Sequence, residues 1–85
     1  MSFAFEEPSP GIPRLILKFV EEATDILDES IPLTRRVALL YKWSWVLHGL
    51  GYDKPLTTME ITRSELISRA ADMLKWSAIV IKEKI

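Results

Sequence analysis

The residues that could take part in catalysis lie close together in the middle of the chain. His48, the one histidine, follows Ser44 by four residues, so the two side chains share a face if this segment is helical. Lys42 comes two residues before Ser44 and points to another side of the helix. A nucleophilic serine also needs a glycine-flanked turn and an acid that orients the histidine, and this segment provides neither. We therefore predict that the protein is not an enzyme and has no catalytic residues.

A cluster of carboxylates is the second place where chemistry could occur. Five acidic residues lie between positions 21 and 29, where they could bind a cation or act as an acid and a base. They have no nucleophile beside them, and their spacing is typical of a solvated helix face. With one histidine and no cysteine, neither a multi-histidine nor a thiolate metal site can form. The sequence predicts no metal and no cofactor.

The aromatic residues could form a binding platform. Trp43, Trp45 and Trp76 could stack on nucleic-acid bases, form the centre of a protein interface, or pack in the core. Base stacking requires basic surroundings, whereas the net charge here is −1 and acidic and basic residues are interspersed. This argues against nucleic acid as a partner and leaves a protein interface and the core as the two interpretations.

Apolar spacing predicts the first two helices that would position these residues. Pro13 suits the first position of a helix, and apolar residues recur at helical spacing after it, which predicts a helix over 13–28. Pro32 separates this helix from a second one over 33–50. The second helix is apolar on nearly every side and therefore requires cover from several directions. Gly51 is expected to end it in the left-handed conformation.

Two capping boxes compete for the start of the third helix. Thr57 with Glu60 fits such a box, and so does Thr62 with Glu65. We expect the helix to begin at Thr57 and to run uninterrupted to the end of the sequence, over a length of about 40 Å. A bend near residue 62 would instead divide it into two helices.

The N-terminal residues are expected to form an extended arm. Two prolines and a glycine exclude a helix over residues 1–12. Phe3 and Phe5 lie on this arm, where they either fold back onto the chain's own core or dock on a neighbour. Residues 13–85 then form a single helical domain, because a chain of 85 residues is too short for two.

The predicted fold is all-α: a compact bundle of three main helices, or four if the last one bends. Hydrophobic residues make up 48% of the chain, which is more than a body of this size readily buries. A third helix of 40 Å would also extend beyond its shorter neighbours. We therefore expect a non-enzymatic protein–protein interaction module, either a small accessory subunit or a homo-oligomer. The residues expected to bind the partner are Phe3, Phe5, Trp43, Trp76, Ile79, Val80 and Ile85.

A helix-turn-helix DNA-binding regulator is the alternative. The second and third helices, with a turn at Gly51, would form the motif, and Arg63 and Arg69 would lie on its recognition helix. The connection is long for this motif, and the third helix begins with an acidic residue. The interaction module is therefore the preferred hypothesis.

A set of residues over 34–82 resembles a known family. It consists of Arg35, Arg36, Tyr41, Leu47, Gly51 and the pattern Thr57-x-x-Glu60, followed by a long helix. The set is similar to the small helical domain at the C-terminal end of membrane-anchored transglutaminase-like proteins. The sequence departs from that family in lacking the membrane span before the domain and the proline often found after the threonine. That domain has no known activity, so the resemblance implies a helical fold and no chemistry.

The composition bears on where the protein works. No run of about 18 apolar residues is present, and the first residues lack the basic start and apolar run of a signal peptide. We therefore expect a cytoplasmic protein without a membrane span. Neither asparagine nor glutamine occurs, while Lys, Glu and Ile are well used, a composition typical of proteins from thermophiles.

Overall fold

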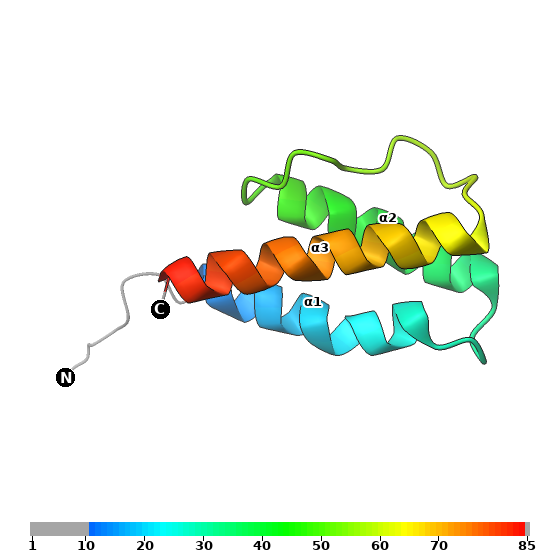
Figure 1. Ribbon diagram of the computed structural model, residues 1–85, viewed down its shortest axis with the longest axis horizontal. Helices are drawn as coiled ribbons and strands as arrows, with labels where there is room; N and C mark the ends of the chain where they lie inside the picture. Colours follow the sequence, from blue (N-terminus) through cyan, green and yellow to red (C-terminus); the bar gives the residue numbers. More distant parts are fainter. Residues whose placement is uncertain (1–10, 85) are drawn as a thin grey trace.

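The computed structural model describes residues 11–84, and within this range the chain forms three helices (Figure 1). Helix α1 spans Gly11–Leu27, α2 spans Leu33–His48 and α3 spans Arg63–Lys84. There is no strand in this part of the chain, and each helix packs against the other two. The predicted all-α bundle of three main helices is thus confirmed.

The order of the helices requires one long return of the chain. Helix α1 runs antiparallel to α2 and α3, which run in the same direction (Figure 1). The short link at residues 28–32 is enough to turn the chain from α1 to α2. Residues 49–62, which we call the crossover, then return along the outside of the bundle to the starting end of α2 before α3 begins (Figure 1).

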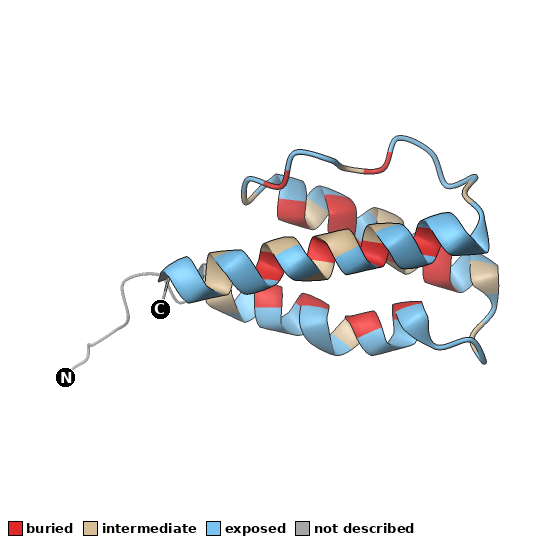
Figure 2. Cartoon of the chain, in the orientation of Figure 1, coloured by how far each residue is buried: buried red, intermediate tan, exposed pale blue. Residues whose placement is uncertain are grey.

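Each helix turns one row of side chains toward the common core, shown in red in Figure 2. The rows follow the three- and four-residue spacing of an amphipathic helix. The crossover adds two buried side chains of its own, so it is part of the core and not a loop around it. The buried apolar residues are Ile16, Phe19, Ala23, Ile26, Val37, Leu40, Trp43, Leu47, Tyr52, Leu56, Leu66, Ala70 and Met73.

Helix α1 begins two residues earlier than predicted. Gly11 and residue 12, the last two residues of the expected arm, are helical, and Pro13 is the third residue of the helix instead of the first. A proline is tolerated there because the first amides of a helix have no intrahelical acceptor. Residues 1–10, with Phe3 and Phe5, lie outside the described part of the chain, so the predicted roles of those two side chains stay predictions.

The predicted glycine end of α2 is confirmed, although the helix itself ends at His48, two residues before its predicted end. Gly51 has φ +119°, in the region that favours glycine. Its N–H donates to the carbonyl of His48 at 3.1 Å, and the N–H of Tyr52 donates to that of Leu47 at 3.0 Å. This is the Schellman pairing, which satisfies the last carbonyls of the helix. It also directs Tyr52 into the core.

The predicted start of α3 at Thr57 is wrong, because the second capping box forms instead. The N–H of Glu65 donates to Thr62 Oγ1 at 3.1 Å, and the N–H of Thr62 donates to Glu65 Oε1 at 2.8 Å. Helix α3 has 22 residues and is therefore about 33 Å long, not 40 Å. None of the helices within residues 11–84 combines the length and the apolar composition that a membrane span requires.

Candidate docking surface

The groove between α2 and α3 is covered by the crossover. Leu56 is held at both backbone groups: its N–H donates to Ser44 Oγ at 2.9 Å, and its carbonyl accepts from Trp45 Nε1 at 2.8 Å. On the α3 side, the hydroxyl of Tyr52 donates to Asp72 Oδ2 at 2.7 Å. The crossover is therefore fastened to both helices. These bonds also explain why no helix starts at Thr57, since the preceding residue is held against α2.

The same contacts exclude the helix-turn-helix geometry that the sequence suggested as an alternative. That motif joins two helices at a steep angle through three or four residues. Here α2 and α3 run side by side, and residues 49–62 separate them (Figure 1). Arg69, expected on a recognition helix, donates instead to the carbonyl of Lys54 in the crossover. The expected recognition unit is therefore absent from α2 and α3.

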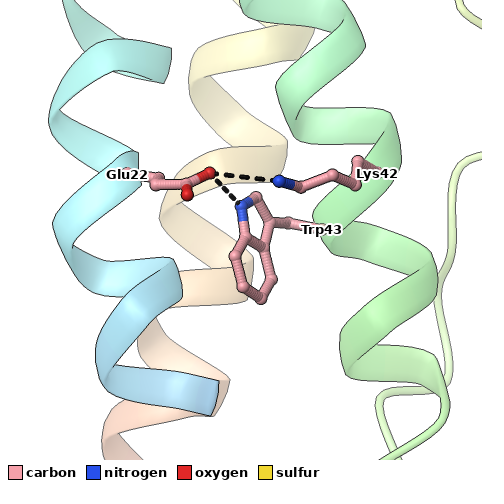
Figure 3. Close-up of polar contacts among 3 residues, drawn as sticks. All are labelled: Glu22, Lys42 and Trp43. Carbon is pink, nitrogen blue, oxygen red and sulfur yellow. Dashed lines mark hydrogen bonds and ion pairs between the residues drawn. The ribbon is translucent and has the colours of Figure 1, made fainter. Parts of the chain in front are cut away.

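The groove between α1 and α2 is closed by a polar bridge (Figure 3). Glu22 Oε1 accepts from the indole Nε1 of Trp43 at 2.8 Å and from Lys42 Nζ at 3.3 Å. Lys42 Nζ also lies 4.9 Å from the centre of the Trp43 ring, within reach of a cation–π contact. The indole hydrogen bond, with the ammonium of Lys42, lowers the pKa of the Glu22 carboxyl below its ordinary value. Glu22 therefore stays ionised at neutral pH.

The position of Trp43 corrects one predicted docking residue. The side chain is 2% exposed and packs against Phe19 of α1, with ring centres 5.6 Å apart. Its indole nitrogen donates to Glu22, which is partly exposed. The sequence left two interpretations open for Trp43, a protein interface and core packing. The structure shows that Trp43 packs in the core.

The groove between α1 and α3 has neither kind of cover. No described segment passes in front of these two helices in Figure 1, and no described hydrogen bond or ion pair joins their side chains. The outer side of each helix carries a largely apolar row of residues, in which the spacing alternates between four and three positions. We call these rows the open face. It consists of Pro13, Leu17, Val20, the polar Thr24 and Leu27 on α1, and of Ile67, Ala71, Leu74, Ala78 and Ile81 on α3.

Helical geometry places both rows on the same side of the bundle. On α1, Glu22 flanks the buried row on the side that faces α2, so Val20 and Leu27 flank it on the side that faces α3. On α3, Asp72 lies on the side that faces the crossover, and Ile67 and Leu74 lie on the opposite side. The two rows therefore line one groove from opposite edges.

The open face is partly exposed, because Leu74 and Ile81 pack against the core while most of its other residues are exposed. Leu17, the residue that falls outside the main apolar row of α1, is 54% exposed, and Val20, Leu27 and Ile67 are each about two-fifths exposed. Ala71 and Ala78 are exposed between them and leave room for a neighbouring helix. Spacing by four and three residues is the repeat with which one helix packs along another. This spacing is present in the sequence, but the buried row of α1 has the same spacing. The sequence alone therefore does not reveal a second row that stays exposed.

The predicted docking residues near the end of the chain lie on the other edge of α3. Ile79 is 50% exposed, and Val80 is partly buried against the core. Trp76 is partly buried and meets Tyr52 edge to face, with ring centres 5.5 Å apart. Together they do not form a continuous apolar surface, because charged residues of the crossover and of α3 line the open pocket around Ile79. Ile85 lies outside the described residues.

The residues considered for catalysis are engaged in the fold. Ser44 Oγ donates to the carbonyl of Tyr41 at 2.9 Å while it accepts from the crossover, and His48 Nδ1 donates to the carbonyl of Tyr52 at 2.7 Å. The two side chains therefore have separate partners and do not bond to each other. Within residues 11–84, no group of three acidic or histidine side chains is arranged to hold a metal ion.

Comparison with known proteins found no matching family model, no matching curated protein and no matching solved structure. The resemblance to the C-terminal domain of transglutaminase-like proteins therefore stays a prediction. Function has to be argued from the open face itself.

Proposed function

We propose that this protein is a non-catalytic interaction module that binds another protein molecule through the open face. The observation that carries the proposal is the pair of largely apolar, partly exposed rows on adjacent helices, each with the spacing of a helix-packing seam. Isolated apolar side chains are common on protein surfaces, but a continuous apolar surface usually marks an interaction site. The contrast within the molecule supports the proposal, since the other two grooves are covered or bridged by its own residues.

A position-specific photo-crosslinker tests the proposal. A benzophenone amino acid is placed at Leu17, in the open face, and separately at Met59, in the crossover, which is equally exposed at 55%. The full chain is irradiated at high concentration, alone and in an extract of its native cells. We expect a protein adduct from position 17 and none from position 59. Equal adducts from both positions, or none from either, would contradict the proposal.

A further inference from the structure

We draw no further inference here: the strongest candidate, the open face between α1 and α3, carries nothing beyond the proposed function, because nothing in the structure of residues 11–84 shows what covers it.

Discussion

Arg36 places a guanidinium group in the interior of the molecule. The residue is 1% exposed, and its Nε donates to the carbonyl of Ile26 at 2.7 Å. That carbonyl belongs to the last turn of α1, where helix carbonyls have no intrahelical donor. The positive charge is also placed where the α1 dipole favours a cation. Its Nη2 atom, in contrast, is buried without a hydrogen-bond partner among the described residues. Arg36 thus joins the end of α1 to α2.

We expect Arg36→Ala to lower the free energy of unfolding by about 2–4 kcal/mol, because it removes both the hydrogen bond and the packing of a long buried stem. Arg35→Ala is the matched control, since the neighbouring side chain is exposed and should change stability by less than about 0.5 kcal/mol. Urea unfolding followed by circular dichroism gives both values. Similar losses for the two variants would show that the buried position has no special role.

The bridge at Glu22 makes a different kind of contribution, because it depends on pH. The carboxylate accepts two hydrogen bonds in the folded chain, and these lower its pKa from the ordinary value of 4.5. A group whose pKa is lower in the folded state stabilises the fold above its unfolded pKa. That stabilisation is lost as the pH falls through the folded value.

Glu22→Gln should therefore be less stable than the unmodified chain at pH 7, by roughly 0.5–1 kcal/mol, because a neutral amide accepts the indole hydrogen bond less strongly. At a pH well below 4.5 the two proteins should have the same stability, since Glu22 is then protonated as well. Urea unfolding at both pH values measures the difference. A constant difference across this range would mean that the charge is not the cause.

At the scale of the elements, the crossover decides where α3 begins. Two boxes in the sequence satisfy the same local rule, and only the one at Thr62 is formed. The other would require residues after Leu56 to coil immediately, although the backbone of Leu56 is bonded to Ser44 and Trp45 on α2. The segment between Leu56 and Thr62 is not helical, so it is long enough for the chain to return along α2. The parallel order of α2 and α3 depends on this segment.

Thr62→Ala should lower the free energy of unfolding by about 1 kcal/mol, because Glu65 loses the acceptor for its backbone N–H. Thr57→Ala is the natural control, since the same substitution is made in the box that does not form a helix start, and it should be close to neutral. Thermal unfolding of the two variants side by side makes the comparison. If Thr57→Ala were the more harmful, the helix would begin at the first box in solution.

In the molecule as a whole, the three grooves between pairs of helices differ in what covers them. One is covered by the crossover, one is bridged by Glu22 with Lys42 and Trp43, and one is left open. Hydrophobic residues are 48% of the chain, and a small body cannot bury them all. Part of the apolar surface that remains lies in the open face, where a second molecule can cover it, whereas Leu15, Trp45, Met59 and Ile79 are exposed elsewhere.

If the open face binds a second copy of this chain, thermal stability should depend on protein concentration. Binding between folded molecules stabilises the folded state by mass action, so the Tm of the unmodified chain should rise with concentration. Ala71→Arg places a long charged side chain in the middle of the open face, and its Tm should be independent of concentration. Calorimetry on dilute and concentrated samples provides the measurement. A constant Tm for the unmodified chain would argue against dimer formation.

The sequence supported the fold much better than the site. Helical spacing predicted the buried rows, and Gly51 predicted the end of α2 correctly. The docking residues were harder to predict, because exposure depends on which neighbour lies opposite each row. Trp43 was among the residues expected to bind the partner and lies in the core, whereas Leu17 was not among them and is 54% exposed in the open face.

On its own, the sequence determined the all-α class, the glycine end of α2 and the rows that could be buried, because these depend on residues within about four positions of each other. Only the tertiary structure decided which capping box forms, which way α3 runs and which groove stays open. Those outcomes depend on contacts between residues far apart in the chain, such as Leu56 with Ser44 and Glu22 with Trp43. Such contacts leave no periodic signal, since each is made once and by side chains of unrelated spacing.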